Sequence, residues 1–194
     1  MSRIIGDITV SLDGFVDGAG DGVEALHAWA LVSDDPVDAA VLASVAGAGA
    51  VVMGRGTFDV VDGPHGWQDG LGYGAREDAR PPFVVVTSSL PEEVRLAATH
   101  DFSFVTSGPA AAVAAAREAA GDADVYVMGG GTTVGSCLAA GLLDVLQLHV
   151  APEALGSGTP LFTGSRHRLV QRDVRVSRAA VHLTYDVSEV PAPG

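Results

Sequence analysis

Short apolar runs recur along the chain and predict the strands of a sheet. We expect these strands at residues 3–10, 49–53, 83–87, 102–105, 124–128 and 143–151. The interior runs are almost continuously apolar, which is typical of parallel strands that helices cover on both faces. Residues 168–178 and 179–188 alternate between polar and apolar side chains instead, so they predict an antiparallel hairpin at the C-terminal end of the sheet.

Ala-rich segments between the apolar runs predict crossover helices, which we expect at residues 36–46, 109–120 and 132–140. Ser107 fits an N-cap before the second helix, and Gly121 fits its C-terminal stop. The whole pattern predicts an α/β fold with three layers. Its centre is a mostly parallel mixed sheet with helices on both faces and an antiparallel C-terminal hairpin.

Length and composition favour one domain. A chain of 194 residues with 47% hydrophobic content buries roughly 70% of the surface that it exposes when unfolded, which suffices for one core. We assign residues 1–190 to that domain and 191–194 to a short tail. No apolar run approaches the ~18 residues of a membrane span, and Arg3 and Asp7 interrupt any signal peptide. We therefore expect a cytoplasmic protein with no membrane partner.

Charge excludes several classes of function. The formal net charge of −13 argues against binding to nucleic acid, which depends on cationic side chains. The sequence contains no Lys, which excludes a phosphate loop of the Walker type and a Schiff-base lysine. Cys137 is the only cysteine, and the acidic loop near Asp17 lacks the spacing of a calcium loop. We expect no metal.

The most informative motif is the triple glycine at residues 129–131, which follows an apolar strand and opens a helix. Glycines let the backbone approach a ligand closely, and a helix N-terminus offers N–H groups to a phosphate. Two other buried strands also end in polar residues, at Arg55 with Thr57 and at residues 87–89. Since carboxyl ends of parallel strands meet at one edge of a sheet, these motifs together predict a dinucleotide site.

In order and spacing these motifs resemble the NADPH-binding signatures of dihydrofolate reductases. The segments VSLDGFV at 10–16 and GLLDVLQLHVAPEALGSGTPLF at 141–162 are similar to the reductase domain of bacterial riboflavin-biosynthesis enzymes and to related stand-alone proteins. The resemblance covers most of the chain. It implies a dihydrofolate-reductase-like fold, NADPH as cofactor, a small-molecule substrate and a homodimer.

The resemblance also implies roles for individual residues. Arg55 and Thr57 would contact cofactor phosphates, Ser88 and Ser89 would lie near the 2′-phosphate, and a cis peptide is expected between two glycines of the 129–131 turn. The residues assigned in this way to the cofactor are Gly54, Arg55, Thr57, Thr87, Ser88, Ser89, Gly129, Gly130, Gly131, Thr132 and Val134.

Two carboxylates compete for the role of proton source. Asp38 resembles the acid that holds the pterin in dihydrofolate reductases, although an acid in the first turn of a helix is also explained by the helix dipole. Asp13 lies in the SLDG motif, which resembles the substrate loop of the riboflavin-pathway reductases. Phe15 stands where many of those enzymes have Lys. His149 and Trp29 could each face the site or have a structural role in the core.

The function expected from these observations is hydride transfer from NADPH to a C=N or C=O bond of a small pterin-like or other heterocyclic substrate. A ribosylaminopyrimidine reductase of the riboflavin pathway is one alternative. A nucleotide-binding protein without catalytic activity is the other. Separate substitution of Asp13 and Asp38 discriminates between an enzyme and a binding module.

Overall fold

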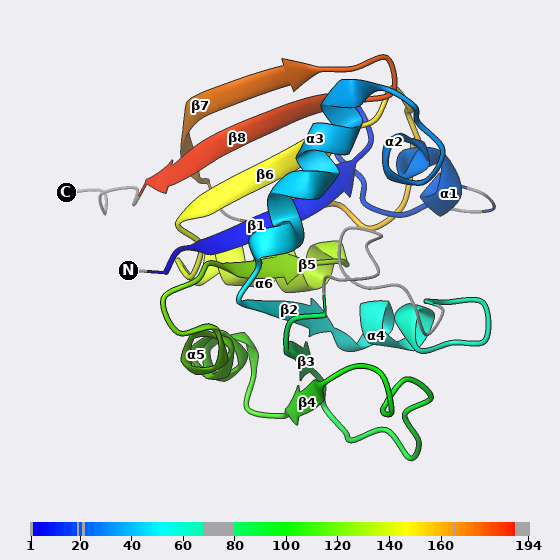
Figure 1. The fold of residues 1–194 in the computed structure, drawn as a ribbon. Helices are drawn as coiled ribbons and strands as arrows, with labels where there is room; N and C mark the ends of the chain where they lie inside the picture. The colour runs from blue at the N-terminus through cyan, green and yellow to red at the C-terminus, as the bar shows by residue number, and fades with distance from the viewer. Residues whose placement is uncertain (1, 19, 21, 68–79, 165, 189–194) are drawn as a thin grey trace.

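The computed structural model describes residues 2–18, 20, 22–67, 80–164 and 166–188. Eight strands form one sheet in the order β4-β3-β2-β5-β1-β6-β8-β7 (Figure 1). All pairs are parallel except β6 with β8 and β8 with β7, which form the expected antiparallel end of the sheet. The strands are β1 (Ile4–Val10), β2 (Ala50–Gly54), β3 (Phe83–Val86), β4 (Phe102–Val105), β5 (Val125–Met128), β6 (Val145–Val150), β7 (Arg168–Val176) and β8 (Val181–Ser188).

Helices cover both faces of the sheet. They are α1 (Gly22–Leu26), α2 (Ala28–Leu31), α3 (Pro36–Ser44), η1 (Val45–Gly47), α4 (Arg55–Val61), α5 (Pro109–Ala120) and α6 (Gly131–Ala139). Side chains of α5 and α6 pack on one face, whereas Val45 of η1 and Phe58 of α4 pack on the other. Neighbouring β1 residues alternate between the two cores, with Ile4 in the first and Ile5 in the second. The three-layer α/β prediction is confirmed.

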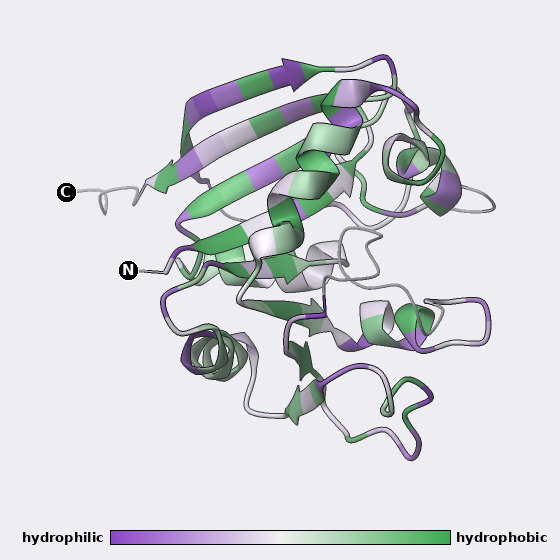
Figure 2. Ribbon diagram, viewed as in Figure 1, coloured by the Kyte–Doolittle hydropathy of each residue, from purple (hydrophilic) through white to green (hydrophobic). Residues whose placement is uncertain are grey.

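The central strands are apolar on both faces, which explains why their sequence periodicity is weak. Figure 2 shows β2 and β3 in continuous green, whereas hydrophilic and hydrophobic colours alternate along β7. The side chains of Arg168, Arg172 and Arg175 on β7 are exposed, as expected for solvent-facing positions. Among the described helices, none is long and apolar enough to cross a membrane.

The structure departs from the sequence prediction at several short elements. Helices α1, α2 and α4 were not expected, because four to seven residues are too few to show a helical period. The predicted N-cap Ser107 is wrong, since Gly108 with φ 91° occupies that position and no side chain caps α5. The Gly-rich segment 62–82 predicts a loop that covers a ligand, and residues 68–79 of it lie outside the described residues.

Unequal strand lengths create the edge at which the motifs meet. Pairing between β1 and β5 ends at Asp7 and Met128, whereas pairing between β1 and β6 continues to Val10 and Val150. The chain leaves the sheet at the 129–131 turn and starts α6 there. The turn therefore lies beside the last part of β1, which projects beyond β5.

Candidate functional site

The glycine turn is held by a hydroxyl from a different segment. Gly129 has φ 85°, a conformation that other residues rarely adopt. A Cβ built on Gly129 would lie 2.3 Å from Thr57 Oγ1, so a side chain here would displace Thr57. Thr57 Oγ1 accepts a hydrogen bond of 2.9 Å from the Gly130 N–H. The expected cis peptide is wrong, because every peptide bond of the described residues is trans; the positive φ of Gly129 makes the turn instead.

The same close approach occurs between β2 and α6. A Cβ on Gly54 would lie 2.2 Å from Thr133 Oγ1, so glycine at this strand end lets the two segments meet. Arg55 follows immediately, and its guanidinium donates to the Ser89 carbonyl at 3.0 Å. The motifs after β2, β3 and β5, far apart in sequence, are therefore in direct contact.

A pocket of about 480 Å³ lies next to this junction. Arg55 and Ser89 line it, and four acidic residues do as well. The acids are Asp59, Asp62, Glu92 and Glu93. Arg55 Nε bonds Asp59 Oδ1 at 2.6 Å, one helical turn away. The guanidinium is thus the cation of a predominantly acidic pocket, and a carboxylate partly neutralises it.

The other residues assigned to the cofactor differ in exposure. The side chains of Ser88, Ser89 and Thr132 are exposed, whereas the Thr87 hydroxyl donates to the Ser89 carbonyl at 2.7 Å and shapes the turn after β3. Val134 is fully buried in the core, and its backbone N–H bonds the Gly130 carbonyl. Only the main chain of Val134 lies at the turn.

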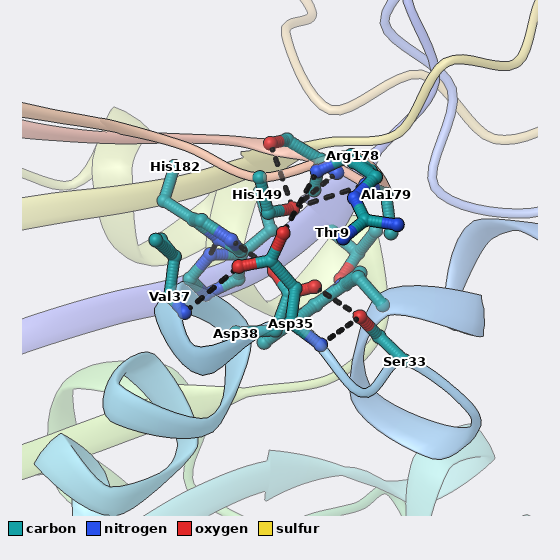
Figure 3. Close-up of polar contacts among 12 residues, drawn as sticks. Thr9, Ser33, Asp35, Val37, Asp38, His149, Arg178, Ala179 and His182 are labelled. Atoms are coloured by element: carbon teal, nitrogen blue, oxygen red, sulfur yellow. Dashed lines mark hydrogen bonds and ion pairs between the residues drawn. The ribbon is translucent and has the colours of Figure 1, made fainter.

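Asp38, the first candidate acid, is buried between α3 and the sheet (Figure 3). It is 1% exposed, accepts a 2.5 Å hydrogen bond from Ser33 Oγ and lies 2.7 Å from His182 Nε2. Burial acts to raise the pKa of Asp38, but hydrogen bonds from Ser33, Ser177 and His182 outweigh it, and the pKa lies below its ordinary value.

Asp13, the second candidate, is an exposed residue that ties two loops together. Its carboxylate accepts hydrogen bonds from Ser11 Oγ at 2.6 Å and from the backbone N–H groups of Leu155 and Gly156. These donors, Ser11 first, lower the pKa of Asp13 to about 2. The carboxylate is therefore ionised at neutral pH.

Several residues around Asp38 were not predicted from the sequence. His182 of β8 and Asp7 of β1 join His149 in a buried polar cluster. Trp29 covers it, since its ring centroid lies 4.4 Å from that of His149 and its Nε1 donates to Thr9 Oγ1 at 3.0 Å. Sequence alternation along β8 places His182 and Leu183 on opposite faces, but cannot reveal which strands lie beside it.

The site meets the structural requirements of a dinucleotide phosphate. Two glycines stand where a Cβ would collide with a hydroxyl, the first turn of α6 has N–H groups without intrahelical partners, and Arg55 supplies a cation. The described residues contain no group of three or more His, Cys, Asp or Glu side chains placed to hold a metal ion.

Comparison with protein families gives one match that spans nearly the whole chain. Residues 3–184 match the RibD C-terminal domain. No curated protein matches significantly.

Solved structures with the same fold carry related descriptions. A putative riboflavin biosynthesis protein from Shewanella sp. PV-4 is 24% identical, with a TM-score of 0.72 over 96% of this chain and 99% of that one. The riboflavin biosynthesis reductase Rib7 of Saccharomyces cerevisiae is 16% identical, with a TM-score of 0.61 over 96% and 90%. Dihydrofolate reductase from Enterococcus faecalis, complexed with NADP(H), is 14% identical, with a TM-score of 0.57 over 96% and 97%. At these identities the likeness shows the fold, which is that of dihydrofolate reductase.

Proposed function

This chain belongs to the RibD C-terminal domain family, and from that membership we propose that it is an NADPH-dependent reductase of a small heterocyclic substrate. The observation that carries the proposal is the contact between three separate strand ends. Thr57 holds the glycine turn, and Arg55 holds the segment after β3. Such an edge of an open α/β sheet is where dinucleotides bind.

The bound cofactor would supply the hydride, while residues of the chain bind it and provide a proton. The backbone of the 129–131 turn and the start of α6 would hold the pyrophosphate. Arg55, with the exposed hydroxyls of Ser88 and Ser89, would bind the 2′-phosphate that distinguishes NADPH from NADH. The Asp59 carboxylate weakens this preference without abolishing it.

Asp38 is the better candidate for the proton source. Both carboxylates are hydrogen-bonded at both oxygens, but Asp38 lies 2.7 Å from His182 Nε2, a ring that can exchange a proton. The donors to Asp13 are one hydroxyl and two backbone N–H groups. Since Asp38 is buried, a proton would leave it through the half-buried Ser33 hydroxyl. Asp38→Asn should lower kcat by about 100-fold or more while NADPH affinity is retained, and Asp13→Asn should chiefly loosen the loops that it joins.

The family match favours a second candidate substrate, a ribosylaminopyrimidine of the riboflavin pathway. Phe15 and the absence of Lys argue against tight binding of its phosphate. We therefore keep a pterin-like or other heterocyclic substrate as the first choice.

The deciding experiment is titration of the purified chain with NADPH and NADH, followed by nicotinamide fluorescence and thermal shift. Micromolar NADPH binding with much weaker NADH binding supports the proposal, and dihydrofolate and the ribosylaminopyrimidine phosphate are then screened for NADPH oxidation. Arg55→Gln should abolish the NADPH preference. Arg117→Gln is the matched control, because Arg117 of α5 forms an exposed ion pair with Asp144. Failure of both nucleotides to bind would refute the reductase.

The proposal includes a homodimer in the cytoplasm. Sedimentation equilibrium on the full chain tests the dimer, with a mass near twice the 19.6 kDa of one chain expected.

A further inference from the structure

Four titratable side chains form a continuous line through the interior. Asp7 Oδ1 lies 2.6 Å from His149 Nε2, and His149 Nδ1 lies 2.8 Å from His182 Nδ1. His182 Nε2 in turn lies 2.7 Å from Asp38 Oδ1. The line runs from β1 across β6 and β8 to α3, because His149 pairs with His182 in the antiparallel register of β6 and β8. Both histidines are 5% exposed, and Figure 3 shows them beside Asp38.

Counting protons along this line gives a definite result. Each of its three contacts is a hydrogen bond and needs one proton. Two neutral imidazoles supply only two, since a neutral ring has one N–H and one bare nitrogen. With both Nε2 protons directed to the carboxylates of Asp7 and Asp38, two bare Nδ1 atoms would face each other at 2.8 Å. A third proton between them removes this repulsion.

We propose that the line Asp7–His149–His182–Asp38 holds one excess proton in the protein interior at neutral pH and relays it to Asp38. In the resting state His149 is an imidazolium that donates to Asp7 and to His182. His182 is neutral and donates from Nε2 to the Asp38 carboxylate.

Three other features agree with this resting state. Burial, the largest influence, lowers the pKa of His182, so that ring stays neutral. The pKa of Asp38 is also lowered, so that carboxylate stays ionised. The Trp29 ring centroid is 4.4 Å from that of His149, within the range at which an indole attracts a cation.

Titratable groups on neighbouring strands also act on the four residues of the line. Arg175 of β7, opposite His182 in the register, disfavours a proton on His182. Tyr126 of β5 interacts with Asp7, and burial raises the pKa of Tyr126 to about 12, so the phenol is neutral. The two carboxylates with one imidazolium leave the line with a net charge of −1.

The relay itself moves protons without any net change in their number. The proton between the rings passes from His149 Nδ1 to His182 Nδ1, and the Nε2 proton of His182 passes to Asp38 Oδ1. His149 is then neutral, and Asp38 is a carboxylic acid. This use of the line rests on the proposed reductase, which consumes one proton for each hydride transferred. Asp7, His149 and His182 act through Asp38 and are positioning residues.

The test is ¹⁵N NMR of the labelled full chain at pH 7–8, in which protonated and bare ring nitrogens have well separated shifts. His149→Gln and His182→Gln identify the two rings. We expect three protonated nitrogens and one bare nitrogen, the bare one assigned to His182. Two bare nitrogens, meaning two neutral rings, would overturn the proposal, and so would four protonated nitrogens.

A kinetic arm tests the relay separately. Asp7→Asn removes the carboxylate that stabilises the imidazolium, so kcat should fall on the order of tenfold above pH 7.5 while NADPH affinity is unchanged. Asp186→Asn is the matched control, because Asp186 of β8 forms an exposed ion pair with Arg172 of β7. An Asp7→Asn profile identical to the wild-type one would overturn the relay. If no substrate is reduced at all, the proposed function fails, and the NMR result still decides whether the excess proton exists.

Discussion

At the residue scale, the candidate site consists of glycines that leave space for a threonine side chain and of an arginine that bonds two residues at once. Thr57 occupies the space that a side chain on Gly129 would need. Arg55 divides its donors between Asp59 and Ser89. Each arrangement gives a substitution whose effect has a definite sign.

Removing the Asp59 charge should strengthen NADPH binding. The ion pair with Arg55 is exposed, with side chains 36% and 53% accessible, so its influence is small. We expect Asp59→Asn to lower the NADPH Kd by roughly two- to fivefold and to leave NADH unchanged. Arg55→Gln should raise the NADPH Kd by about tenfold or more. Parallel fluorescence titrations measure both, and equal effects on the two nucleotides would contradict the assignment of Arg55 to the 2′-phosphate.

The two neighbouring glycines of the turn should tolerate alanine very differently. Gly129→Ala forces a Cβ against Thr57 in a strained conformation and should cost about 1–3 kcal/mol in the free energy of unfolding. A Cβ on Gly130 would lie 3.7 Å from Thr57 Oγ1 and φ is negative there, so Gly130→Ala should be close to neutral. Urea unfolding compares them. Equal stability of the two variants would show that Thr57 does not pack against the turn.

That the segments after β2, β3 and β5 meet at one edge of the sheet could be predicted from the sequence, because each motif directly follows an apolar run. The buried line of Asp7, His149, His182 and Asp38 could not be predicted from the sequence. Asp38 and His182 are 144 positions apart, and a lone histidine in an alternating strand carries no sign of its partner. Asp13 looked equivalent to Asp38 in the sequence, and only the structure distinguishes it, by its exposed position and its two backbone donors.

At the scale of elements, the start of α3 fixes where Asp38 lies. Asp35 is the N-cap, with its carboxylate accepting from the Val37 N–H at 2.9 Å. The other oxygen of Asp35 accepts from the Arg178 N–H in the turn between β7 and β8. The cap therefore joins α3 to the hairpin that carries His182.

Substitution of this cap should destabilise the protein. Asp35→Ala leaves the Val37 N–H of α3 without its side-chain partner and should cost about 1 kcal/mol in urea unfolding. Asp34→Ala is the control, because Asp34 is the exposed preceding residue. If the two variants lose the same stability, the cap is not what holds α3 in place.

The strand ladder was predictable at this scale because apolar runs mark β1 to β6 and alternating segments mark β7 and β8, each within about two residues. The short helices α1 and α2 were not. The position of α2, for example, depends on packing of Trp29 against Ala180 at the β8 end of the sheet. A local pattern of four or five residues does not encode such a contact.

At the scale of the whole molecule, the buried line couples stability to pH. The pKa of His182 is lowered from its ordinary 6.5, so the unfolded chain takes up a proton that the folded chain refuses as the pH falls below about 6.5. Stability should therefore drop toward pH 5, by up to about 1.4 kcal/mol per pH unit.

Urea unfolding from pH 5 to 9 measures this curve. His182→Gln should flatten its acid side, whereas His65→Gln, at an exposed position, should follow the wild type. A wild-type curve that rises steadily toward pH 5 would contradict the buried neutral His182.

The outer strand β7 has a further consequence for how copies of this chain meet. No described strand pairs with β7 on the side away from β8, and open strand edges favour strand addition and fibril growth. The exposed Arg168, Arg172 and Arg175 and the register shift between Gln171 and Asp173 repel and distort an incoming strand. We therefore expect the charged side chains of β7 to oppose aggregation of the folded chain.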